Sequence, residues 1–386
     1  MKNWIEKVAR LKEDGEYRSL DTISAAQRPR TVIDNKEVIM LASNNYLGLS
    51  TNPKVKAKTK EVIDEYGTGS GGSRLTTGNY DLHQQLEANL AKFEARESAL
   101  VFNTGYMANL GVISTLMDRN DLILSDELNH ASIIDGCRLS KAEVKIYQHA
   151  NLEDLKEKLV KYREEFAKVL IVTDGVFSMD GDLAPLPAIA ELATQFDSLV
   201  MVDDAHGTGV IGEQGRGIVD YFGLEEEIDI QVGTLSKALA SEGGFVAGSE
   251  NLIELLLNKA RPFIYSTALA PATIAASLAA LDYLSNNPHR VQKLHKNIKF
   301  LKSGLVELGY QVVESNSAII PIMIGKKEQA LNLSAKLLEE GILAPAIRPP
   351  TVPVGTSRIR TTVMATHSQN DLEEVLTAFK KVKKSI

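Results

Sequence analysis

Short apolar runs rich in β-branched residues alternate with longer segments of helical periodicity through the middle of the chain. The runs that we expect to form strands are 99–102, 122–124, 144–147, 169–173, 199–202, 230–232 and 245–247. Between these runs, Leu82, Leu86, Leu90 and Phe93 recur at the spacing of one helix face. This alternation is typical of βαβ units, so we predict an α/β fold with a large, doubly wound and mainly parallel sheet.

The pattern changes after about residue 286. The remaining chain contains a long amphipathic stretch, a strand-like run and two helical segments, over 286–308, 318–324, 329–340 and from 371 onwards. Such a pattern suits a smaller C-terminal α+β domain with the start of the chain packed beside it. We therefore predict three parts: an N-terminal arm and segment over 1–45 that packs with the small domain, a large domain over 46–285 and the small domain over 286–386.

The charge balance and the single cysteine narrow the range of functions. With 43 basic and 50 acidic residues, the formal charge is −7, which argues against nucleic acid as a partner because phosphate neutralisation needs a dense basic face. Cys137 alone forms neither an internal disulfide nor a thiolate cluster, and we expect no metal. The first residues lack the apolar block of a secretion signal, and the longest weakly polar run, 269–284, is too short to span a bilayer. We expect a cytoplasmic protein without a membrane partner.

A lysine follows one of the predicted strands. In segment 232–237 the strand runs into Thr234 and Ser236 and then into Lys237. Ligands of open α/β sheets bind at the carboxyl ends of the strands, so we expect Lys237 in the crevice there. A lysine in that place can form an imine while the neighbouring hydroxyls hold an anion. The alternative is an ordinary solvated loop lysine.

Two carboxylates and a histidine follow another strand, at Asp203, Asp204 and His206. A buried carboxylate needs a cationic partner, because an unpaired buried charge is costly. The protonated ring nitrogen of pyridoxal phosphate is such a partner, and proteins bind this cofactor through a lysine imine and an acid at that nitrogen. Asp203 and Lys237 would then meet across one ring. A helix-capping aspartate beside a structural histidine is the alternative.

Three further polar segments follow strands of the same sheet. A turn at Gly105 opens a helix whose N-terminus suits a phosphate, His130 can stack on an aromatic ring, and Ser178 lies in a polar turn at 173–182. Each segment alone has an ordinary structural explanation. Because all five polar segments converge on one sheet edge, we interpret them as parts of one cofactor site.

The whole chain resembles the α-oxoamine synthase family, the fold-type I pyridoxal-phosphate enzymes that condense an amino acid with an acyl thioester and release carbon dioxide. The resemblance rests on an ordered set of motifs at 43–49, 69–74, 126–130, 178–181, 203–206, 233–237 and 264–267. It implies a fold-type I transferase architecture, pyridoxal 5′-phosphate as the cofactor, and a homodimer with the active site at the subunit interface.

The resemblance also assigns roles around the cofactor, with Lys237, His130, Asp203 and His206 as the catalytic residues. Lys237 would carry the cofactor as an aldimine and move protons at the substrate α-carbon, while Asp203 would pair with the ring nitrogen. The other expected contacts are His130 stacked on the ring, His206 and Ser178 at its 3-hydroxyl side, Gly105, Tyr106 and Thr234 around the phosphate, and Ser266 or Thr267 at the phosphate of the neighbouring subunit.

A second set of residues matches the substrate site of the family. Arg360 corresponds to the arginine that clamps the carboxylate of the amino acid, while Asn44 and Thr351 line the site. Arg348 belongs to the same stretch as Thr351 and is assigned to substrate binding with it. Arg18 aligns with the family by little more than its spacing.

The motifs leave the acyl donor open between two reactions. Segments 346–353 and 71–78 resemble the members that join L-alanine to pimeloyl-CoA or its acyl-carrier-protein equivalent in biotin biosynthesis, whereas 126–130 and 231–237 are shared with members that join glycine to acetyl-CoA. We expect the first reaction and keep the second as the alternative. A regulatory module that retains the fold without turnover is a third possibility, against which the intact lysine, aspartate and histidines argue.

Overall fold

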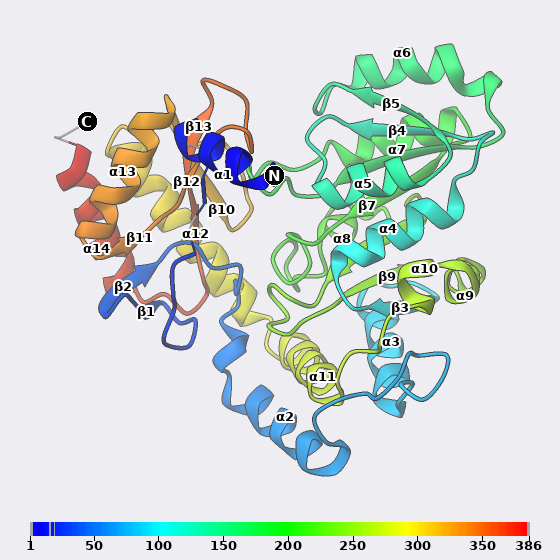
Figure 1. Ribbon diagram of the computed structural model, residues 1–386, viewed down its shortest axis with the longest axis horizontal. Helices are drawn as coiled ribbons and strands as arrows, with labels where there is room; N and C mark the ends of the chain where they lie inside the picture. Colours follow the sequence, from blue (N-terminus) through cyan, green and yellow to red (C-terminus); the bar gives the residue numbers. More distant parts are fainter. Residues whose placement is uncertain (1–2, 15–16, 19, 384–386) are drawn as a thin grey trace.

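The computed structural model describes residues 3–14, 17–18 and 20–383 and contains a central mixed sheet of 7 strands (Figure 1). In spatial order, the strands are β3 (Ser98–Phe102), β9 (Gly244–Gly248), β8 (Ile230–Thr234), β7 (Leu199–Asp203), β6 (Val169–Asp174), β4 (Leu122–Asp126) and β5 (Glu143–Tyr147). Strand β9 runs antiparallel to both of its neighbours, whereas the pairs from β8 to β5 are parallel. The predicted mainly parallel sheet is therefore confirmed.

Both faces of this sheet are covered by helices, because alternate residues of each strand point to opposite sides. In β6, for example, Leu170 and Val172 pack into one apolar cluster, whereas Val169 and Ile171 pack into another. The first cluster is covered by α4 (Gly105–Leu116), α5 (Ala131–Leu139), α9 (Glu250–Lys259) and α10 (Arg261–Ile264). The opposite face is covered by α3 (Asp81–Phe93), α6 (Leu152–Tyr162), α7 (Leu186–Gln195) and α8 (Ile218–Phe222). The sheet is doubly wound, as predicted.

Two smaller sheets and three helices form a second layered unit (Figure 1). One sheet joins β10 (Ile319–Gly325), β13 (Ser357–Thr362) and β12 (Ala346–Ile347), and the other joins β1 (Arg30–Ile33), β2 (Lys36–Met40) and β11 (Ile342–Leu343). The helices are α12 (His289–Glu307), α13 (Lys327–Glu339) and α14 (Gln369–Lys383). Because β2 pairs with β11, the start of the chain and its last third share one sheet. The division at residues 45 and 285 itself stays a prediction.

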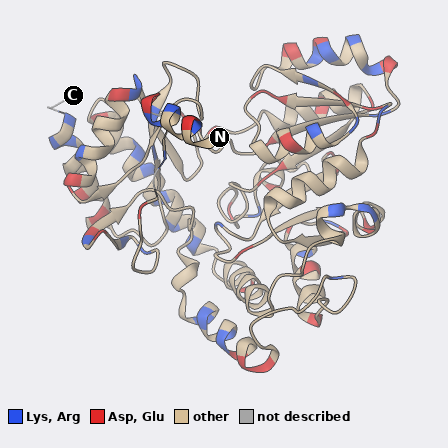
Figure 2. Cartoon of the chain, in the orientation of Figure 1, with Lys and Arg blue, Asp and Glu red and all other residues tan. Residues whose placement is uncertain are grey.

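The remaining elements connect these units or lie at their edges. They are α1 (Trp4–Glu13), α2 (Pro53–Tyr66), α11 (Pro271–Asn286) and two short 3-10 turns at Leu49–Thr51 and Arg163–Glu165. Helices α2 and α11 pack side by side below the two units (Figure 1). Basic and acidic residues are mixed along outer helices such as α6 (Figure 2), as the nearly balanced composition predicts.

Across residues 3–14, 17–18 and 20–383, no helix combines the length and the apolar character that crossing a bilayer requires.

A glycine shapes the turn that follows the buried side chains of Tyr46 and Leu47. Gly48 has a φ of 66°, and a Cβ added to it would lie 2.3 Å from Cγ2 of Thr366. We expect Gly48→Ala to lower the free energy of unfolding by about 1–2 kcal/mol through the left-handed backbone and by a further ~1–3 kcal/mol through the steric clash. Urea unfolding measures the sum.

Two other glycines separate these two contributions. Gly67, at φ 78° and ψ −166°, has a backbone conformation that is essentially restricted to glycine, but open space surrounds its added Cβ. Gly69 has open space and no positive φ. Gly67→Ala should therefore lose only the backbone contribution, and Gly69→Ala should remain close to the wild type. Equal stability of all three variants would contradict this account of the Gly48 turn.

Candidate active site

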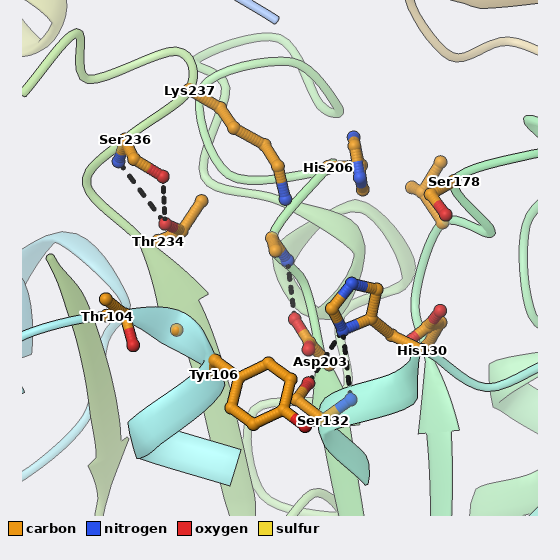
Figure 3. A pocket seen from close by; sticks show the side chains of 14 residues that line it. Thr104, Tyr106, His130, Ser132, Ser178, Asp203, His206, Thr234, Ser236 and Lys237 are labelled. Carbon is orange, nitrogen blue, oxygen red and sulfur yellow. Dashed lines mark hydrogen bonds between the residues drawn. The ribbon is translucent and has the colours of Figure 1, made fainter. Parts of the chain in front are cut away.

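A cavity of about 190 Å³ lies at the carboxyl ends of β6, β7 and β8, where the sequence predicted a crevice. It is lined by Thr104, Gly105, Tyr106, His130, Ser132, Asp174, Val176, Ser178, Asp203, Ala205, His206, Thr234, Ser236 and Lys237 (Figure 3). All five polar segments singled out in the sequence contribute to this lining. For scale, a cavity of about 150 Å³ accommodates a benzene ring, so there is room for a substituted aromatic ring.

Lys237 reaches into this cavity from the loop after β8, toward the side where Asp203 and His206 lie (Figure 3). Burial lowers the pKa of the Lys237 amine, although the negative charges of Asp203 and Asp174 oppose this shift. Lys237 therefore loses its proton more easily than a solvated lysine does. A neutral amine is the form that can attack an aldehyde or accept a proton.

Asp203 ends β7 and is held at both carboxylate oxygens. Its Oδ2 accepts a hydrogen bond from Nδ2 of Asn109 at 2.6 Å, and its Oδ1 accepts one from the backbone N–H of Ala205 at 3.0 Å. Burial and the charge of Asp203 raise the pKa of the neighbouring Asp174 well above its usual value. Asp203 is therefore the carboxylate arranged to meet a cation.

Asn109 also connects Asp203 with His130. Its Nδ2 lies 2.8 Å from Oγ of Ser132, which in turn lies 2.7 Å from Nδ1 of His130. Since Nδ1 also accepts from the backbone N–H of Ser132, the Ser132 hydroxyl donates to Nδ1. Sequence reasoning assigned no role to Asn109. The signal that could have found it is a polar side chain within the apolar helix α4.

Both histidines of the cavity favour the neutral form. Burial lowers the pKa of His130 against the opposing charge of Asp203, with a smaller decrease from Lys237. Burial lowers the pKa of His206 well below its usual value. Nδ1 of His206 lies 2.7 Å from the hydroxyl of Tyr46. Because that hydroxyl donates to Oδ1 of Asn44 at 3.1 Å, Nδ1 of His206 carries the proton. Tyr46 is a second residue to which the sequence analysis gave no role.

The N-terminus of α4 forms one wall of the cavity. The backbone N–H of Met107 donates to Oγ1 of Thr104 at 3.0 Å, whereas the N–H groups of Gly105 and Tyr106 have no partner within the described part of the chain. These N–H groups and the helix dipole favour an anion. The side chain of Tyr106 turns instead to Asp135 on α5. Its ring still lies at the cavity, edge-on to His130 with 6.4 Å between the ring centroids (Figure 3).

Two hydroxyls stand opposite this helix N-terminus. Thr234 Oγ1 donates to the carbonyl oxygen of Gly243 at 2.9 Å and lies 2.8 Å from Oγ of Ser236. The donor set of the cavity fits pyridoxal phosphate in three respects. Lys237 offers an amine for its aldehyde, and Asp203 offers a carboxylate for its ring nitrogen. The free N–H groups at the N-terminus of α4, which begins at Gly105, can bind its phosphate.

Arg360 approaches the cavity from β13 and is 7% exposed. Its Nε donates to the carbonyl oxygen of Ser178 at 2.6 Å, and its Nη2 lies 3.4 Å from Oδ1 of Asn44. Because Ser178 lines the cavity, the guanidinium lies close to it. The charge of Arg360 also lowers the pKa of His206, after the larger effects of burial and Lys237. The structure thus brings Arg360 and Asn44 together beside the predicted cofactor residues.

Besides Asn44 and Arg360, the predicted site residues Arg18, Arg348, Thr351 and Thr267 also lie outside the cavity lining. Arg18 donates from Nη2 to Oγ1 of Thr351 at 3.3 Å, and Arg348 lies nearby, with its Nη2 3.5 Å from the carbonyl oxygen of Tyr17. Thr267 is exposed, and its carbonyl oxygen accepts from Nδ2 of Asn103 at 2.8 Å. The substrate roles of Arg18, Arg348 and Thr351 and the phosphate role of Thr267 stay predictions.

Known proteins match the chain over nearly its full length. The family model for aminotransferase class I and II covers residues 36–379. The 8-amino-7-oxononanoate synthase of Lysinibacillus sphaericus is 50% identical over 376 residues, which are 97% of this chain and 96% of the relative. The enzyme of the same name from Thermoanaerobacter pseudethanolicus is 48% identical over 381 residues, covering 99% and 96% of the two chains.

A solved structure is also similar to this chain over its full length. A serine palmitoyltransferase from S. paucimobilis, with PLP-myriocin bound, is similar to this chain with a TM-score of 0.94 and 33% identity, covering 100% of this chain and 97% of that chain. Its fold confirms the predicted fold-type I architecture. The chain therefore belongs to the aminotransferase class I and II family and, within it, to the α-oxoamine synthase group.

Proposed function

We propose that the chain catalyses the 8-amino-7-oxononanoate synthase reaction, the step of biotin biosynthesis that joins L-alanine to pimeloyl-CoA or pimeloyl-carrier protein. The products are 8-amino-7-oxononanoate, carbon dioxide and the free thiol carrier. The observation that carries this proposal is the meeting of Lys237, Asp203 and the N-terminus of α4 in one cavity. The curated relatives, 44–50% identical over almost the entire chain, support the choice of substrates.

Pyridoxal phosphate is the cofactor. When bound, it supplies an aldehyde that captures the amine of the amino acid and a ring that withdraws electrons from its α-carbon. In our proposal Lys237 would hold the cofactor at its aldehyde, and Asp203 would keep a proton on the ring nitrogen. Asn109 holds the orientation of Asp203 through its 2.6 Å hydrogen bond.

Different residues of this chain bind the amino acid and transfer its proton. Arg360 binds the carboxylate of L-alanine and orients the bonds of the α-carbon, assisted by Asn44. Lys237, whose pKa burial lowers, removes the α-proton as a general base and later returns a proton. His130, whose pKa burial lowers, would lie beside the ring as a neutral imidazole and would add no positive charge next to the proton that Asp203 would hold.

Two finer proposals concern the setting of the reaction. We infer a homodimer, supported by the exposed position of Thr267, whose predicted phosphate contact then falls in the neighbouring subunit. Sedimentation at micromolar concentration tests it, and a fully active monomer would contradict it.

We also infer a cytoplasmic location, supported by the use of a single cysteine, Cys137, which is buried and unpaired. Fractionation of cells, followed by detection of the protein in each fraction, tests that inference. Recovery of the folded protein outside the cytoplasm would contradict it.

Replacing the proposed cofactor lysine gives the first test of this function. We expect Lys237→Ala to abolish turnover and to remove the visible absorbance of the covalently bound cofactor, because no other amine in the described cavity lining can replace it. Lys259→Ala, on the exposed side of α9, should leave both properties unchanged. A visible spectrum that Lys237→Ala does not alter would refute the assignment.

Replacing the proposed ring-nitrogen partner separates binding from chemistry. Asp203→Asn keeps the shape of the side chain but removes its charge, so we expect cofactor to remain bound while kcat falls by about 10²-fold or more. Absorbance measures the bound cofactor, and product formation measures kcat. Near-normal turnover in this variant would count against the electrostatic role of Asp203.

The acyl donor is decided by comparing two substrate pairs. We expect a higher kcat/KM with L-alanine and a pimeloyl thioester than with glycine and acetyl-CoA, the pair used by glycine C-acetyltransferase. A preference for glycine and acetyl-CoA would establish the alternative reaction. Failure of every thioester in a panel of increasing chain length would favour a module without turnover.

A further inference from the structure

His149 lies between two carboxylates outside the cavity. It follows β5, and its Nδ1 lies 3.0 Å from Oδ1 of Asp126, the last residue of β4. Its Nε2 lies 2.9 Å from Oδ2 of Asp182, in the loop after β6. The ring also packs edge-on against Phe177, with 4.4 Å between the ring centroids. The imidazole therefore bridges two loops of the large sheet.

Both ring nitrogens of His149 donate in this arrangement, because each faces a carboxylate oxygen. Burial alone would lower the pKa of His149, but the hydrogen bonds and charges of Asp126 and Asp182 together raise it to about 10. The ring is thus an imidazolium near neutral pH. An imidazolium with one charge-assisted hydrogen bond on each side links the loops of Asp126 and Asp182 more strongly than a neutral ring could. We call this linkage the His149 tie.

One end of this tie fixes the segment that carries His130. The Asp126 carboxylate, whose side chain is 1% exposed, also accepts from the backbone N–H groups of Leu128 and Ala150, each at 2.9 Å. Next to it, Asn129 Nδ2 donates to the carbonyl oxygen of Val172 at 2.8 Å. The turn that leads into His130 is therefore held by Asp126 on one side and by β6 on the other.

The other end fixes the loop that carries Ser178 into the cavity. The carbonyl oxygen of Asp182 accepts from the N–H of Phe177 at 3.1 Å, which closes this loop on itself. The carbonyl oxygen of Ser178 accepts a hydrogen bond from Nε of Arg360. In the same loop, Asp180 forms an ion pair with Arg358. The loop is thus the surface on which β13 places its two arginines.

We propose that His149 is a positioning residue for this active site, which holds the Ser178 loop in register with the His130 turn and so fixes where Arg360 meets the substrate carboxylate. His149 itself contributes nothing to the cavity lining. The substrate part of this inference rests on the proposed function. The part that concerns cofactor retention rests only on the Ser178 loop and the His130 turn.

The variant His149→Gln removes the charge and at least one of the two hydrogen bonds. Since a displacement of about 1 Å can cost up to ~10²-fold, we expect the KM for L-alanine to rise about tenfold. The KM for the acyl thioester should change by less than about twofold, because Arg360 faces the amino acid. The holoenzyme should also lose its cofactor faster on dilution, which the decay of its visible absorbance measures.

Arg163→Gln is the matched control. Arg163 also ties one loop with several hydrogen bonds, among them 2.6 Å to the carbonyl oxygen of Phe196 and 2.9 Å to Oδ2 of Asp197, but far from the cavity lining. This variant should lower the Tm and leave the KM for L-alanine and cofactor loss unchanged. If His149→Gln behaves in the same way, His149 is only a stabilising residue and the proposal is overturned.

A second pair of variants carries the test if His149→Gln does not fold. Asp182 has a side chain that is 27% exposed, so replacing it leaves little buried space. Asp182→Asn keeps a hydrogen-bond acceptor and should retain most of the wild-type KM for L-alanine, whereas Asp182→Ala should raise it. Equal KM values for the wild type and Asp182→Ala would contradict the positioning role.

The charge of His149 gives a further readout that packing alone would not move. Because its folded pKa of about 10 exceeds the usual 6.5, its charge stabilises the fold fully below about pH 6.5, and this contribution is lost as the pH rises toward 10. The Tm difference between the wild type and His149→Gln should therefore shrink over this range. A difference that stays constant would overturn the charged form of the tie.

The two proposals fail in different ways. If the wild type makes no product from L-alanine and a pimeloyl thioester, the proposed function fails. The rate of cofactor loss from the His149 and Asp182 variants would still decide the positioning role, since it requires no acyl donor.

Discussion

The candidate site depends on holding the amine of Lys237 away from bulk water at the end of a parallel sheet. Burial disfavours the ammonium, while Asp203 and Asp174 favour it, and the net result is a lowered pKa. An amine in this balance can lose its proton and regain it. Asp203 lies buried at the same cavity, and its carboxylate can pair with the ring nitrogen of pyridoxal phosphate.

Two hydrogen-bond networks arrange the groups around this amine. One runs from Asp203 through Asn109 and Ser132 to His130, and it sets both the carboxylate and the ring. The other runs from Arg360 through Asn44 and Tyr46 to His206, and it links β13 to the cavity. Networks of this kind hold the reacting groups in a fixed arrangement, which reduces the reorganisation that the reaction requires.

The sequence predicted the parts of this site that follow directly from strand ends. Apolar runs located the strands, and Lys237, Asp203 and His130 stand where those runs stop. Asn109 and Tyr46 escaped prediction because their hydrogen bonds join residues 94 and 160 positions apart, which helix and strand periodicity does not reveal. Arg18 and Thr351 were assigned by resemblance, and the structure places them in contact with each other but outside the cavity lining.

The most direct measurement of the central claim is borohydride reduction of the purified yellow holoenzyme, followed by peptide mass mapping. Reduction fixes the cofactor to the side chain that bears it. The account predicts a single modified peptide with the added mass on Lys237. An unmodified Lys237 peptide, or the cofactor fixed to a different lysine, would contradict it.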